Sequence, residues 1–121
     1  MKKIKVLFYE TGAEPKLLEI ENTLEAMQKL VGGHIEHLTF SNGYSVICNE
    51  DGICRRLPIN RIVYPFGKDE STETGIFGDF FIVKEGAEEF LSVDPDVNLT
   101  HYIASIAETE KIVQRIIQGA M

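Results

Sequence analysis

Residues 34–48, with the sequence HIEHLTFSNGYSVIC, decide the fold class of this chain. Residues 34–40 and 44–48 have the composition of strands and flank Ser41-Asn42-Gly43. An Asn-Gly pair accepts the positive φ angles of a type I′ turn, the tightest way to join two antiparallel strands. The stretch therefore predicts a β-hairpin.

A second turn follows directly after this hairpin. Glu50-Asp51-Gly52 has turn composition and Ile53-Cys54-Arg55 begins like a further strand, which predicts a three-stranded meander. A three-residue loop with Gly52 in the bulge position would place Cys48 opposite Cys54. Two interpretations stay open: cysteines that pair under oxidation, or two small residues that remain reduced.

Toward the N-terminus, the chain predicts another hairpin and then a helix. Residues 4–9 and 17–20 have strand composition and are separated by turn residues at 11–15. An apolar stripe at helical spacing follows, made of Leu24, Met27, Leu30 and Val31.

The ends of this helix are marked by capping residues. Asn22 is the expected N-cap, with Glu25 three residues later as in a capping box. Gly32 is expected to end the helix in the left-handed conformation that glycine adopts without strain.

Toward the C-terminus the pattern is less regular. Pro58 argues against a central strand over residues 57–64. Residues 65–75 are polar and form a loop of a length at which loops are either functional or disordered, and both readings stay open. Residues 77–83 predict a strand and residues 88–93 a short edge strand.

A longer helix is expected at the end of the chain, from about residue 95 to about residue 118. Asp94 would cap it, and Pro95 would occupy the first helical position. Its apolar positions are Val97, Ile103, Ile106, Val113, Ile116 and Ile117. They drift from a heptad pattern, so a coiled coil is not favoured, although the helix could pair two copies of the chain into a homodimer.

Together these elements predict one α+β domain over residues 1–121. It would contain a mainly antiparallel sheet of about 5–7 strands, one short helix after the first hairpin and a longer C-terminal helix, with the helices packed on one face. A length of 121 residues and 44% hydrophobic composition suit a single domain with its own core.

Composition also limits location and partners. No apolar stretch approaches the roughly 20 residues of a membrane span, so we expect no membrane contact and a cytoplasmic location. A net charge of −7 argues against direct binding to nucleic acid, which needs a basic surface. The acidic residues from position 76 onward either form a solvated face or imitate the phosphates of DNA.

No catalytic, metal-binding or cofactor-binding pattern stands out. His34 and His37 are three apart in a predicted strand and therefore point to opposite faces, which rules out joint chelation. The sequence lacks phosphate-binding glycine motifs and hydrolase triads. We predict no catalytic residue, metal or cofactor, while a site assembled from distant residues stays open.

The polar residues around the second turn are the candidates for binding. Arginine forks match carboxylate and phosphate groups, so a cluster on one surface could grip an anion. Structural ion pairing with the acidic C-terminal third is the alternative. The candidate binding residues are Asn49, Glu50, Asp51, Arg55, Asn60 and Arg61.

Four stretches in this order carry a family resemblance: LEAMQKLVGGHIE at 24–36, ICNEDG at 47–52, LPINR at 57–61 and GDFFIV at 78–83. The chain, over residues 4–93, resembles the bacterial family called domain of unknown function 3846. Its members are short proteins found largely on phages, plasmids and conjugative elements. The resemblance implies a compact domain carried by mobile DNA and implies no activity.

Three hypotheses about function follow. The first is a non-enzymatic accessory protein of a mobile genetic element that binds a host or element protein. The second is a domain that binds a small anionic ligand or a nucleotide through Arg55, Asn60 and Arg61. The third is an acidic decoy that mimics DNA.

Overall fold

The computed structural model describes residues 2–70 and 72–119, and in them the chain forms seven strands and two helices. The predicted α+β class, with a short helix after the first hairpin and a helix at the C-terminal end, is confirmed. The elements are β1 (Lys3–Tyr9), β2 (Lys16–Glu21), α1 (Leu24–Val31), β3 (Ile35–Thr39), β4 (Tyr44–Asn49), β5 (Ile59–Val63), β6 (Thr74–Phe77), β7 (Phe80–Lys84) and α2 (Ile106–Gly119).

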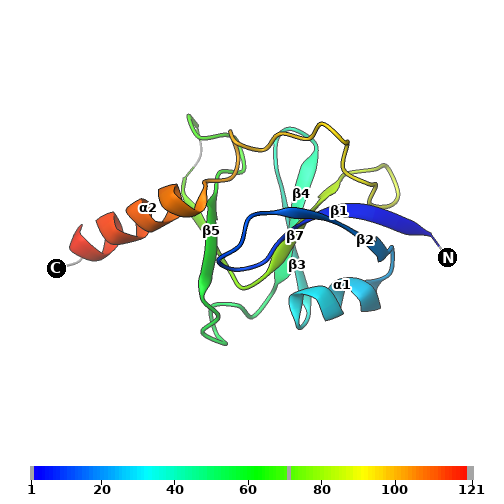
Figure 1. Ribbon diagram of the computed structural model, residues 1–121, viewed down its shortest axis with the longest axis horizontal. Coiled ribbons are helices and arrows are strands. Elements are labelled where there is room, and N and C mark those ends of the chain that lie inside the picture. The colour runs from blue at the N-terminus through cyan, green and yellow to red at the C-terminus, as the bar shows by residue number, and fades with distance from the viewer. Residues whose placement is uncertain (1, 71, 120–121) are drawn as a thin grey trace.

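Five strands form an antiparallel sheet in the order β2-β1-β7-β4-β3, and β5 pairs with β6 in a separate two-stranded sheet (Figure 1). The central strand β7 is held between β1 and β4. Phe80, Phe81, Ile82 and Val83 are all fully buried, because both faces of the sheet are covered at this strand.

Helix α1 covers one face of the five-stranded sheet (Figure 1). Thr23, and not the predicted Asn22, is its N-cap: the Thr23 hydroxyl accepts a hydrogen bond from the Ala26 amide at 3.1 Å. Gly32 ends the helix with φ 78°, as predicted. The buried residues of this layer are Ile4, Val6, Phe8, Met27, Val31, Ile47, Phe81 and Val83.

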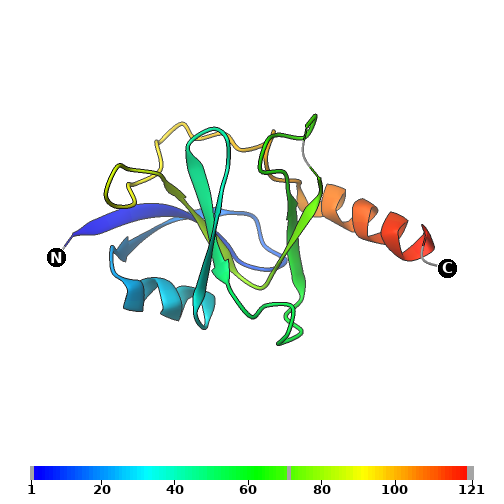
Figure 2. The same cartoon turned by 180° about the vertical axis from the view of Figure 1, so that it is seen from behind.

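The opposite face of the sheet is covered by the β5–β6 pair and by residues 93–103 (Figure 2). Alternate strand residues point to this side, as the pleat requires. The buried residues of this second layer include Tyr9, Val46, Cys48, Val63, Ile76, Phe80, Ile82, Leu99 and Ile103.

Helix α2 packs on the outer side of β5, against Ile62 and Ala104, and then projects away from both sheets (Figures 1 and 2). The prediction that both helices lie on one face of one sheet is therefore wrong. The Thr109 hydroxyl accepts a hydrogen bond from the Ile62 amide at 3.2 Å and ties the helix to the strand.

The hairpin between β3 and β4 is confirmed, but its turn differs from the prediction. Only Gly43 has positive φ in this loop, at 88°, so the turn is not type I′. The Gly43 amide donates to the Phe40 carbonyl at 3.3 Å, and the Phe40 amide donates to the Tyr44 carbonyl at 2.8 Å. This is a three-residue loop with glycine in the left-handed position.

Residues 50–56 do not form the predicted second hairpin. The Arg55 amide donates to the Asp51 carbonyl at 2.8 Å and the Leu57 amide to the Gly52 carbonyl at 2.9 Å. These bonds coil the chain away from the five-stranded sheet, and Arg56 takes a φ of 57°. No strand begins at residue 53, and the place beside β4 is taken by β7.

The predicted opposition of Cys48 and Cys54 is consequently wrong. Cys48 lies opposite Glu36 in the β3–β4 ladder and is buried. Cys54 lies in the exposed coil after the Asn49 end of β4, and both cysteines are free.

The stretch 77–83 is two strands and not one. Gly78, with φ 87°, turns the chain between β6 and β7, which belong to different sheets. The edge strand predicted at 88–93 is reduced to a single bridge between Lys84 and Leu91. Strand β5 starts directly after Pro58, outside the five-stranded sheet.

The final helix begins eleven residues later than predicted, at Ile106. Asp94 is not its cap, because the Asp94 carboxylate binds the Tyr44 hydroxyl and the Lys84 ammonium. Ser105 caps the helix, and the residues before it form an irregular segment over the second core layer.

The loop predicted at 65–75 contains the start of β6 at Thr74, and its residue 71 lies outside the described residues. The Lys68 amide donates to the His101 carbonyl at 2.9 Å, which joins this loop to the segment before α2.

Candidate functional site

The structure divides the predicted binding residues between two places. Asn49 and Arg55 lie together at the C-terminal end of α1. The Asn49 side-chain amide donates to the Val31 carbonyl at 3.1 Å, and the Arg55 guanidinium donates to the Gly32 carbonyl at 2.8 Å. Both therefore satisfy carbonyls that the helix end leaves open, which is a structural role.

Glu50 and Asp51 are exposed at the turn beside Asn49. The Asp51 amide donates to the Asn49 side-chain oxygen at 2.8 Å, an Asx-type turn bond. Neither carboxylate forms an ion pair with Arg61. Because Arg61 is buried in β5 while Glu50 and Asp51 are exposed, the six predicted residues do not form one surface.

Asn60 and Arg61 occupy the second place, in β5, and both are buried. The Asn60 side-chain amide donates to the carbonyls of Tyr9, at 2.8 Å, and Gly78, at 2.9 Å. Asn60 thereby links both sheets, and its side-chain oxygen accepts a hydrogen bond from Arg61 at 2.7 Å.

Arg61 is a buried cation, with 1% of its surface exposed. Its Nη1 also contacts the Asn60 carbonyl at 3.2 Å, and its Nη2 donates to the Ala13 carbonyl at 2.7 Å. Among the described residues no carboxylate lies within ion-pair distance of it, and its Nε–H has no protein acceptor. Burial lowers the pKa of Arg61, yet a guanidinium stays charged at neutral pH.

Tyr9 lies beside Arg61 and is 6% exposed. Its ring stacks on Phe80 with centroids 4.7 Å apart. Burial raises the pKa of Tyr9 to about 12, against the opposing effect of the Arg61 charge. The Tyr9 hydroxyl has no partner among the described residues, and no described side chain holds a fully buried polar atom without one, so this hydroxyl reaches solvent-accessible space.

Tyr9 also lines an open pocket of about 630 Å³ between the β1–β2 turn, β1, β5 and residues 95–108. Pockets of about 300–1,000 Å³ are typical for small ligands. Arg61 and Tyr9 are its most buried polar lining residues. Its apolar walls include Leu7, Leu17, Val97, Leu99, Ile103 and Ala104.

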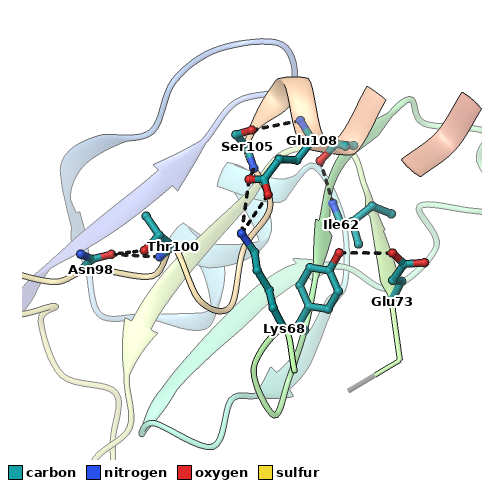
Figure 3. A network of polar contacts seen from close by, with 9 residues as sticks. Ile62, Lys68, Glu73, Asn98, Thr100, Ser105 and Glu108 are labelled. Carbon is teal, nitrogen blue, oxygen red and sulfur yellow. Dashed lines mark hydrogen bonds and ion pairs between the residues drawn. The ribbon is translucent and has the colours of Figure 1, made fainter. Parts of the chain in front are cut away.

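The polar rim of the pocket is formed by the segment leading into α2 (Figure 3). The Ser105 hydroxyl accepts from the Glu108 amide at 3.1 Å, and the Glu108 carboxylate accepts from the Ser105 amide at 2.9 Å. Lys68 also binds this carboxylate, at 3.1 Å. The Ser105 amide and the Lys68 ammonium together lower the pKa of Glu108.

The sequence patterns did not indicate Tyr9 or the polar rim as parts of a site. No local pattern distinguishes Tyr9 from the core residues around it, since its role depends on the neighbour that β5 brings. The rim did carry a signal: Ser105 and Glu108 have the spacing of a capping box.

A second polar cluster lies on the five-stranded sheet. The Glu85 carboxylate accepts a hydrogen bond from the Ser45 hydroxyl and contacts Nε2 of His37. Burial raises the pKa of Glu85, but the bonds from Ser45 and His37 outweigh it and lower the pKa overall. The carboxylate stands between the two other groups, so His37 does not reach the serine hydroxyl as a general base would.

Neither α1 nor α2 combines the length and the apolar composition needed to cross a lipid bilayer. Among the described residues, no three His, Cys, Asp or Glu side chains gather as metal ligands would.

Comparison with known proteins places the chain in a family. No curated protein and no solved structure matches it significantly. The family model described as Domain of unknown function (DUF3846) matches residues 4–109, a range that includes every residue lining the pocket. The chain therefore belongs to the DUF3846 family.

Proposed function

We propose that this domain binds a small anionic ligand in the pocket beside Arg61. The observation that carries the proposal is a buried guanidinium with no carboxylate partner among the described residues. A buried charge is costly unless it is paired. The three hydrogen bonds to neutral oxygens offset part of that cost, and an anion in the pocket would supply the missing charge.

Tyr9 supports this assignment. Its hydroxyl and the Arg61 Nε–H are both donors without an acceptor among the described residues, and both residues line the same pocket. Two neighbouring donors suit the two oxygens of a carboxylate or of a phosphate edge. Of the predicted binding residues, this site uses Arg61. Asn60 orients Arg61 by accepting a hydrogen bond from its guanidinium.

The test is a thermal-shift screen of small carboxylates, phosphates and zwitterions on the wild type and on Tyr9→Phe. A ligand that binds the folded state raises its apparent stability in a concentration-dependent way. Tyr9→Phe removes a hydroxyl with no protein partner, so the variant should fold normally and bind about tenfold more weakly, as loss of one hydrogen bond to a charged group implies.

Tyr64→Phe is the matched control, because Tyr64 lies outside the pocket and its hydroxyl binds Glu73. The proposal fails if no anion stabilises the wild type, or if both tyrosine variants bind equally well.

We propose as a second candidate that α2 docks on another protein. Ile116 and Ile117 are 56% and 55% exposed near the end of a helix that projects from the body (Figure 1). An accessory protein of a mobile genetic element, acting in the cytoplasm of a bacterial host, would use such a face to bind a host or element protein. Pairing of two copies through α2 is the other outcome.

The experiment compares wild type with an Ile116→Ser/Ile117→Ser variant. Both side chains are largely solvent-exposed, so the variant should keep its stability. Size-exclusion chromatography with light scattering tests self-association, and affinity capture followed by a binding isotherm with the purified captured protein tests the partner. This candidate is refuted if the wild type is monomeric and if no captured protein binds it more strongly than it binds the Ile116→Ser/Ile117→Ser variant.

A further inference from the structure

The lining of the Arg61 pocket has an unequal charge balance. It holds one guanidinium and three carboxylates, those of Glu14, Asp96 and Glu108. Glu108 is neutralised by Lys68, while Glu14 and Asp96 make no hydrogen bond or ion pair with a described residue. A polyanion such as a nucleoside triphosphate would meet repulsion from these two carboxylates after it had satisfied Arg61.

Of these three carboxylates, that of Glu14 is connected to Arg61 through the β1–β2 turn. It directly follows Ala13, whose carbonyl accepts the Arg61 Nη2–H at 2.7 Å, so the same turn carries both an arginine contact and a carboxylate at the pocket. The Glu14 charge raises the pKa values of both Arg61 and Tyr9, as its proximity to the two groups requires.

The pocket thus presents donors and an acceptor side by side. The donors are the Arg61 guanidinium and the Tyr9 hydroxyl, and the acceptor is the Glu14 carboxylate at the more open side. The walls between them are aliphatic, made of Leu7, Leu17, Leu99 and Ile103.

We infer that the ligand is a small zwitterion with an apolar body, of the α-amino-acid type. Its carboxylate binds Arg61 and Tyr9, its ammonium group binds Glu14, and its side chain packs on the aliphatic walls. This inference rests on the proposed function, and it narrows an anion in general to a molecule with adjacent negative and positive groups.

The test uses two matched series and NMR titration of the ¹⁵N-labelled full chain. One series is phenylalanine, 3-phenylpropanoate and phenethylamine. The other is leucine, 4-methylpentanoate and 3-methylbutylamine. ATP serves as the polyanion. In at least one series the zwitterion should bind about fivefold more tightly than the carboxylate without the amine, the value of one partly exposed ion pair.

Glu14→Gln should abolish that advantage and leave the affinity for the plain carboxylate the same or higher. Glu19→Gln is the control, because Glu19 lies exposed on β2 outside the pocket and its replacement makes the same charge change. Chemical-shift changes should be largest at Tyr9, Ala13 and Arg61.

The outcomes separate this inference from the proposed function. If the plain carboxylates bind as well as the zwitterions, or if ATP binds best in a manner sensitive to Tyr9→Phe, the zwitterion is refuted and anion binding stands. If Glu14→Gln and Glu19→Gln have equal effects, the assigned ammonium site is refuted. If neither series nor any other anion binds, both proposals fail.

Discussion

The Cζ atom of Arg61 lies 5.3 Å from the centroid of the Tyr9 ring, and that ring in turn stacks on Phe80 with planes 8° apart. A cation over an aromatic face gains about 0.5–2 kcal/mol, more when it is shielded from water. Arg61 is therefore stabilised by a ring and by neutral oxygens, and no carboxylate among the described residues lies within ion-pair distance of it.

Replacing Arg61 with Met should weaken both binding and folding. The substitution leaves the Ala13 carbonyl and the Asn60 side-chain oxygen without their donor, so we expect a loss of about 1–3 kcal/mol in the free energy of unfolding. Urea denaturation measures this loss. Arg61→Lys keeps the charge without the fork and should recover part of it. An unchanged midpoint for Arg61→Met would contradict the role given to these bonds.

The stability of the protein should fall in alkali because of Tyr9. The unfolded chain releases the Tyr9 proton near the ordinary value of 10.0, whereas the folded state keeps it until about pH 12, because burial raises this pKa. The stability that the protonated Tyr9 side chain contributes is fully present below pH 10 and is lost as the pH rises through 12. Its size is at most about 2–3 kcal/mol.

Urea titrations at several pH values from 8 to 11 measure the effect. Tyr44 and Tyr64 also have raised pKa values through burial, so the wild type loses stability from several groups. The difference in the free energy of unfolding between wild type and Tyr9→Phe isolates the contribution of Tyr9. Above pH 10 the wild type should lose stability relative to Tyr9→Phe. A constant difference across this range would contradict the raised pKa.

The elements closed by local contacts could be predicted from the sequence. The first hairpin, α1 and the β3–β4 hairpin each join neighbouring segments through turn or cap residues that the sequence displays. The fold class follows from them, since three such units already define an antiparallel sheet with a helix.

The remaining elements depend on distant contacts that a single sequence does not display. Strand β7 pairs with β1, about seventy residues earlier, and with β4, where a strand beginning at Ile53 was predicted. Asp94-Pro95 looks like a helix start, but Asp94 is engaged by Lys84. The site has the same origin, because Tyr9, Arg61 and the Ser105 rim meet only after both sheets have packed.

The position of α2 should depend on Thr109. This residue is buried, and its hydroxyl satisfies the Ile62 amide in β5. Thr109→Val has nearly the same shape but leaves that amide unpaired, so we expect a loss of about 1–3 kcal/mol. Thr109→Ser keeps the hydroxyl and should lose less. Hydrogen exchange of the Ile62 amide should accelerate in the valine variant and not in the serine variant, and equal exchange in both would refute the bond.

Gly52 should tolerate no side chain, for a reason of space. A Cβ atom at this position would lie 2.6 Å from the carbonyl oxygen of Phe77, closer than real Cβ contacts, and the obstacle is backbone that cannot swing aside. Gly52→Ala must therefore push the coil at 50–56 away from β6, which we expect to cost more than about 3 kcal/mol.

Gly12→Ala is the control for this prediction, because its Cβ would meet no atom within 4 Å and only its φ of 82° opposes the change. That variant should lose about 1–2 kcal/mol. Urea denaturation of both variants decides the matter: equal losses in the free energy of unfolding would show that the coil can shift away from β6 at little cost.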